Sequence, residues 1–118
     1  MEYGMNSTLR VNFKNGIQTD ILESIEFLFK QKNKNDAEAI KAVVWKKGEE
    51  TDDVYTLEGD LSKFYIRFPK EDTFKFEPKK NFYLDLRVHY EGTFDNPQID
   101  VVPIFMKPGL FGKGDDYE

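Results

Sequence analysis

The 118-residue sequence predicts an all-β domain, a two-sheet sandwich of about seven short strands. Short runs in which apolar and polar side chains alternate recur along the chain, and turn-forming Gly, Pro, Asn and Asp separate them. The composition agrees, because 11 Phe, 6 Tyr and 1 Trp favour sheet over helix. A closed barrel is the main structural alternative.

The sixth run, Phe82 to Tyr90, has the clearest strand pattern. Its apolar face consists of Phe82, Leu84, Leu86, Val88 and Tyr90. Its polar face consists of Tyr83, Asp85, Arg87 and His89. This period of two matches a strand with one buried face and does not match the spacing of a helix.

Six further runs read as strands of the same kind. They cover Thr8 to Lys14, Ile21 to Gln31, Ile40 to Lys47, Val54 to Leu57, Lys63 to Phe68 and Ile99 to Lys107. Pro103 cannot donate a ladder hydrogen bond, which predicts a sheet edge or a bulge for the last run. Residues 32–38 are expected to form an exposed hairpin loop or one helical turn, and residues 69–81 a crossing loop.

The apolar faces of these runs predict a single core, since a chain of this length buries one. The expected core residues are Phe27, Phe29, Trp45, Phe64, Ile66, Phe68, Leu84, Leu86 and Val88. Residues 1–107 form the predicted domain, and residues 108–118 a flexible C-terminal tail. Seven short strands with turns between them are typical of an immunoglobulin-like sandwich, in which Trp45 fills the centre without a disulfide beside it.

Composition excludes several classes of function. The formal net charge of −5 disfavours binding to nucleic acid. No window has the ~20 apolar residues of a membrane span, and the N-terminus lacks a signal-peptide pattern, so we expect a protein that is made in a cytoplasm and has no membrane partner. The absence of Cys excludes disulfides, a thiolate nucleophile and a Cys-based metal site.

The sequence contains no recognisable catalytic motif. His89, the one histidine, lies on the polar face of a strand with no nucleophile-elbow motif. Asp52-Asp53 and Asp115-Asp116 lack the spacing of a calcium loop, and no phosphate-binding loop occurs. A carboxylate pair such as Asp85 with Glu58 has almost no specificity among 22 acidic residues. We therefore expect no enzyme activity, no cofactor and no metal.

Two sets of residues remain as candidates for function or structure. Tyr83, Asp85, Arg87 and His89 combine an aromatic, an Arg and other polar groups, which suits a protein interface, although an ordinary solvated sheet face is the alternative. Asp72 and Thr73 are expected to structure the crossing loop. Asp72 would accept hydrogen bonds from the backbone, Arg67 or Arg87, unless it is a solvated loop residue.

The stretch Phe64 to Val88 resembles a pattern in small proteins of Gram-positive phages and prophages, including N-terminal domains of baseplate upper proteins. The matching residues are Glu71-Asp72-Thr73, Phe76, Lys79-Lys80 and Tyr83 to Arg87. The chain has one residue fewer between Tyr83 and Asp85 than the pattern, and it lacks the Leu-Thr-Gly segment that many baseplate relatives have before the second strand.

This resemblance implies an immunoglobulin-like virion protein, made in the host cytoplasm, that contacts other tail proteins or copies of itself and has no catalytic residues. A carbohydrate or host-surface binding module is the alternative, with Tyr65, Tyr83 and Phe94 as candidate stacking aromatics. A small hydrolase that uses His89 is a third hypothesis.

Overall fold

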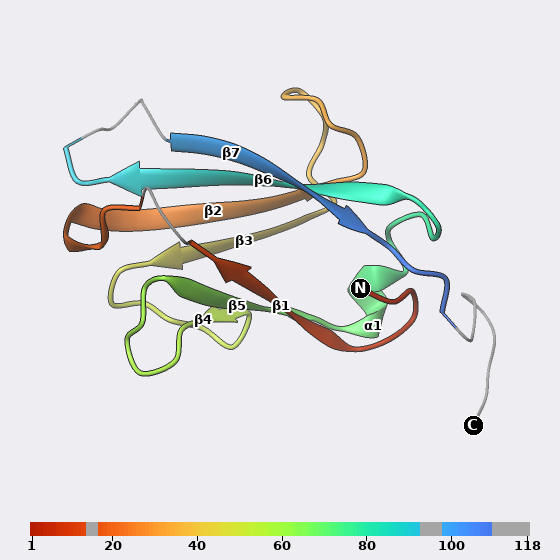
Figure 1. The fold of residues 1–118 in the computed structure, drawn as a ribbon, viewed down its shortest axis with the longest axis horizontal. Helices are drawn as coiled ribbons and strands as arrows, with labels where there is room; N and C mark the ends of the chain where they lie inside the picture. Colours follow the sequence, from red (N-terminus) through yellow and green to blue (C-terminus); the bar gives the residue numbers. More distant parts are fainter. Residues whose placement is uncertain (14–16, 93–97, 110–118) are drawn as a thin grey trace.

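The structure is a computed structural model that describes residues 1–13, 17–92 and 98–109. Phe94, Asp115-Asp116 and most of the predicted tail lie outside these residues. The strands are β1 (Ser7–Asn12), β2 (Leu22–Lys30), β3 (Lys41–Lys46), β4 (Val54–Tyr55), β5 (Lys63–Phe68), β6 (Asn81–Tyr90) and β7 (Gln98–Phe105). A 3₁₀ turn, η1 (Thr19–Ile21), and one helical turn, α1 (Lys70–Thr73), complete the elements (Figure 1).

The strands form two separate antiparallel sheets, so the fold is a sandwich and not a barrel (Figure 1). One sheet has the order β1-β5-β4 and the other β3-β2-β6-β7. This order corresponds to strands B, E and D facing strands C′, C, F and G in the immunoglobulin scheme. The chain is therefore an all-β, immunoglobulin-like sandwich, as the alternating runs predict.

Aromatic rings hold the two sheets together. All nine core residues named from the sequence are buried. Phe64 on β5 contacts Trp45 on β3 edge to face, at 5.2 Å between ring centroids, and Phe27 on β2 at 5.9 Å. These rings therefore pack against one another across the two sheets, and truncation of one such buried aromatic to Ala typically costs about 3–5 kcal/mol.

The crossing loop differs in detail from its sequence prediction, whereas the β2–β3 loop agrees with one. The crossing loop contains α1, and it buries Phe76, while Phe74 packs edge to face on Tyr3 at 5.1 Å. Residues 32–38 form the loop of the antiparallel hairpin of β2 and β3, which is the first of the two forms predicted for them. The register of β7 against β6 is unbroken from Gln98 to Phe105, so Pro103 marks a sheet edge and not a bulge.

Candidate interaction surfaces

The face of the four-stranded sheet that points away from the core is called the outer face here. Strand register places the predicted interface residues of β6 on it, each opposite an outward residue of β2 or β7. Arg87 lies between Glu26 and Ile99, and Asp85 lies between Leu28 and Val101. The pattern of the sixth run therefore identified one face correctly, but that face consists of two unlike halves.

One half is closed by a buried ion pair. Asp85, expected on an exposed face, is only 3% exposed. Lys30 Nζ donates to Asp85 Oδ2 at 2.8 Å, and Arg87 Nη2 donates to the same oxygen at 3.1 Å. Lys30 also donates to the carbonyl oxygens of Lys34 and Asn35, which fixes the β2–β3 loop over this end of the sheet. Asp85 is thus a structural group and not a contact for a partner.

The ion pairs also determine the protonation of Asp85. Burial on its own raises the pKa of this carboxyl group, but the hydrogen bonds and charges of Arg87 and Lys30 outweigh burial. The pKa of Asp85 therefore lies below its ordinary value, and the carboxylate stays ionised at neutral pH. Tyr83 lies at the same end, beside loop residues Lys32 and Lys34.

The other half of the outer face is open. Arg87 and His89 keep 29% and 25% of their side chains exposed, and His89 Nε2 lies 2.9 Å from Glu26 Oε2. A shallow hollow of about 320 Å³ is lined by Glu23, Ser24, Glu26, Val44, Lys46, His89 and Tyr90. Of the four predicted interface residues, this half keeps Arg87 and His89.

The open half brings Ser24 and His89, the residue types of a hydrolytic pair, onto neighbouring strands. Ser24 lies opposite His89 in register, but no hydrogen bond joins their side chains. β2 and β6 are interior strands, so their paired backbone N–H groups point at neighbouring strands, and the pairing of β2 is irregular only between Leu22 and Ser24. Within the described residues, no group of three His, Asp or Glu side chains converges as a metal site.

An exposed apolar row runs along β7, beside the open half at Ile99 and beside the closed half from Val101 onward. Ile99, Val101, Pro103 and Phe105 share the outward side of this edge strand, and Ile99 and Phe105 are about half exposed. On the inward side, Val102 is also exposed. The sequence interpretation missed this row, although the alternation from residue 99 to residue 105 contains its signal. We call Ile99, Val101, Pro103 and Phe105 the β7 row.

The free backbone edge of β7 is protected from strand pairing. Lys107, just beyond β7, exchanges hydrogen bonds with Met1 and Tyr3 on the side away from β6. Phe105, Pro103, Val101 and Ile99 lie at even spacing from Lys107, so their backbone groups also point away from β6. Of these, Pro103 has no N–H, and the N–H of Val101 donates to Asp100 Oδ1 at 3.0 Å. Both features reduce the capacity of this edge to add a further strand.

Asp72 fixes the crossing loop, but through partners other than the predicted arginines. Lys41 Nζ donates to Asp72 Oδ2 at 2.6 Å, and Lys75 Nζ lies 3.1 Å from Asp72 Oδ1. α1 directs the Asp72 carboxylate toward Lys41 at the start of β3, so its partner is neither Arg67 nor Arg87. Burial raises the pKa of Asp72, but the two lysines outweigh it and hold the pKa below its ordinary value.

Thr73 contributes a second set of contacts to the same loop. Its buried hydroxyl accepts a hydrogen bond from the N–H of Gly4 and donates one to the carbonyl of Lys70, each at 2.8 Å. Together, Asp72 and Thr73 connect α1 to β3 and to the N-terminal segment.

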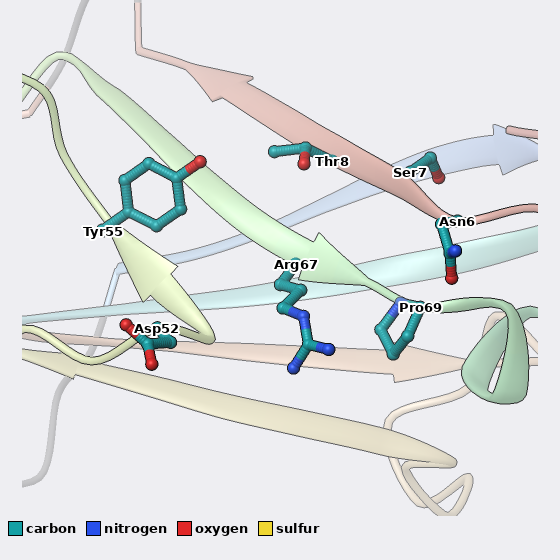
Figure 2. A pocket seen from close by; sticks show the side chains of 7 residues that line it. All are labelled: Asn6, Ser7, Thr8, Asp52, Tyr55, Arg67 and Pro69. Atoms are coloured by element: carbon teal, nitrogen blue, oxygen red, sulfur yellow. The ribbon is translucent and has the colours of Figure 1, made fainter.

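A second hollow lies on the three-stranded sheet (Figure 2). It has a volume of about 410 Å³ and is lined by Asn6, Ser7, Thr8, Asp52, Tyr55, Arg67 and Pro69. Tyr55 stacks on Tyr65, with ring centroids 5.5 Å apart. The sequence interpretation named Tyr65 as a surface aromatic but not this hollow, because three segments distant in sequence form it.

Comparisons with known proteins identify no family. No family model matches the chain, and no curated protein matches its sequence. Among solved structures, the chain is similar to the V domain of amphioxus IgVJ-C2, with 9% identity, 92% of this chain and 97% of that chain covered, and a TM-score of 0.36. Across residues 1–13, 17–92 and 98–109, no helix is long and apolar enough to cross a membrane. The strand order of the two sheets identifies the chain as an immunoglobulin-like sandwich.

Proposed function

We propose that this chain is a non-enzymatic structural protein of a phage or prophage tail or baseplate, and that it docks onto another tail protein. The docking surface is the open half of the outer face together with the β7 row. The observation that carries the proposal is the exposure of three large apolar side chains, Ile99, Val101 and Phe105, along one strand. Contiguous exposed apolar side chains with a polar margin are typical of interaction sites.

The neighbours of the row match the usual composition of an interface. Arg87 lies directly opposite Ile99 and keeps 29% of its side chain exposed, and Arg is enriched where interfaces derive most of their binding energy. Val44 on β3 adds an exposed apolar side chain at the far side of the open half. The protected edge of β7 favours contact through side chains over addition of a strand.

The assignment to a tail rests on the resemblance of Phe64 to Val88 to phage proteins, and the docking role rests on the exposed surface. Co-expression with the products of neighbouring genes, followed by measurement of the mass of the purified complex, tests both. A discrete complex with a tail protein supports the proposal, and a discrete oligomer of this chain alone supports docking with itself as the partner. A strict monomer that binds none of these products contradicts it.

A further inference from the structure

We propose that the hollow on the three-stranded sheet binds a saccharide that carries an acidic group. This site is separate from the docking surface, because the two lie on opposite sheets of the sandwich. In Figure 2, Arg67 extends from β5 between Asp52 on one side and Pro69 on the other. The hollow thus combines a cation with groups that bind hydroxyls.

The hollow contains one cation, Arg67, and one acid, Asp52, so the acidic group of the ligand is expected to bind Arg67 on the side away from Asp52. Arg10 and Lys63 are exposed on the same side of the three-stranded sheet, but outside the lining of the hollow. The acid paired with Arg67 is Asp53, whose Oδ1 is 4.0 Å from Arg67 Nη1, beyond hydrogen-bond distance. The planar guanidinium of Arg67 is therefore available to bind a carboxylate with two parallel hydrogen bonds.

The remaining polar groups of the hollow suit hydroxyl groups. Asn6 Oδ1 accepts a hydrogen bond from the N–H of Lys70, which leaves both amide N–H donors of Asn6 for a ligand. Within the part of the chain that the structure describes, the side chains of Thr8, Asp52 and Tyr55 make no hydrogen bond to the protein. A carboxylate, a phenol and a threonine hydroxyl accept and donate as a sugar ring requires.

Size and shape favour a saccharide over an acidic peptide. The volume of about 410 Å³ is within the range of small-ligand sites, roughly 300–1,000 Å³. Asp52 and Tyr55 lie at one end of the hollow and Asn6 and Pro69 at the other (Figure 2). Sites of this volume hold small ligands such as a sugar, whereas an extended peptide needs a longer groove.

The test is a titration of the ¹⁵N-labelled protein with glucuronic acid, with glucose and acetate as separate probes, followed by NMR. Glucuronic acid is expected to shift the backbone amide signals of Thr8, Tyr55 and Arg67 to saturation. Glucose lacks the acid and acetate lacks the hydroxyls, so each is expected to bind about tenfold more weakly or worse, as loss of one charged hydrogen bond predicts. Equal shifts with glucose, or no saturable shift with glucuronic acid, would overturn the proposal.

Two variants locate the site. Arg67→Gln is expected to raise the Kd for glucuronic acid about tenfold or more, and it should fold normally because the Arg67 side chain is 60% exposed. Lys80→Gln removes the same charge from a side chain that is 64% exposed just before β6, and it should leave the Kd unchanged. An unchanged Kd in folded Arg67→Gln, checked by thermal unfolding, would overturn the assignment. Val101→Glu changes the docking surface and not the hollow. It should weaken docking and leave the Kd for glucuronic acid unchanged, so either proposal can fail without the other.

Discussion

Lys30 and Asp85 form an ion pair of 2.8 Å on the outer face of the sheet, and each side chain is only 4% exposed. The pair connects the end of β2 to the middle of β6, across 55 residues of sequence. Because Lys30 also donates to two carbonyl groups of the β2–β3 loop, the same ammonium holds that loop in place. The polar face of β6, which the sequence predicts to be solvent-exposed, is therefore partly buried.

Asp85→Ala is expected to lower the free energy of unfolding by about 3–5 kcal/mol, because it leaves the ammonium of Lys30 buried without its counter-charge. The measurement is urea unfolding followed by fluorescence of Trp45. Glu77→Ala is the control, since Glu77 and Lys80 form an exposed pair, expected to contribute under about 1 kcal/mol. Equal losses in the two variants would contradict the structural role of Asp85.

Stability is expected to fall in acid because Asp72 and Asp85 both have pKa values below the ordinary 3.8. A group whose pKa is lower in the folded state stabilises the fold above the unfolded pKa and loses this contribution as pH falls through the folded pKa. The free energy of unfolding should therefore decline below about pH 4.

Asp72→Asn removes one of these titrating groups. Over that range, its unfolding free energy should depend on pH less steeply than that of the unmodified chain, by at most about 1.4 kcal/mol per pH unit. Urea unfolding between pH 2 and pH 6 measures the two slopes. Identical slopes would show that Asp72 titrates alike in the folded and unfolded states.

Asp72→Ala is expected to cost about 1–3 kcal/mol, because it removes a charged acceptor for Lys41 and Lys75. The loss should also speed amide hydrogen exchange in α1 and at the start of β3, the elements that Asp72 connects. A change in stability within error of zero would assign Asp72 to the solvated loop residues.

Pro103→Thr is expected to promote association between chains through the β7 edge. The substitution adds an N–H that points away from β6, and Thr favours strands. Static light scattering during a temperature ramp should record aggregation earlier than in the unmodified chain, whereas Thr8→Val, on an exposed strand of the other sheet, should not change it. Unchanged scattering would show that Pro103 does not protect this edge.

The sequence was sufficient for the fold because alternation is a local property. Phe82, Leu84, Leu86 and Val88 identify the buried face of β6 without knowledge of any neighbour, and Pro103 identifies an edge strand by its missing donor. The short run at Val54 proved to be the two-residue strand β4. Periodicity and turn chemistry together therefore predicted the strands and their buried faces, and the two separate sheets of the structure decide for the sandwich over the barrel.

The candidate sites depend on contacts between distant segments, and these are what the sequence could not predict. The pairing of Lys30 with Asp85 needs the register of β2 against β6, and the pairing of Asp72 with Lys41 needs the direction in which α1 turns. The same holds for the hollow around Arg67, whose walls come from three segments. Alternation identifies the face on which a residue lies but not what lies opposite it.

The most direct test of the docking role compares how Val101→Glu and Asn12→Glu are incorporated into tail particles. Both positions are exposed, but Val101 belongs to the β7 row and Asn12 lies on the opposite sheet. The amount of each variant that co-sediments with purified tails is measured by quantitative mass spectrometry. We predict that Val101→Glu is lost from the tails while Asn12→Glu remains, since a charge buried in an apolar contact opposes association. Equal incorporation of the two variants, or the absence of the unmodified chain from the tails, would contradict the account.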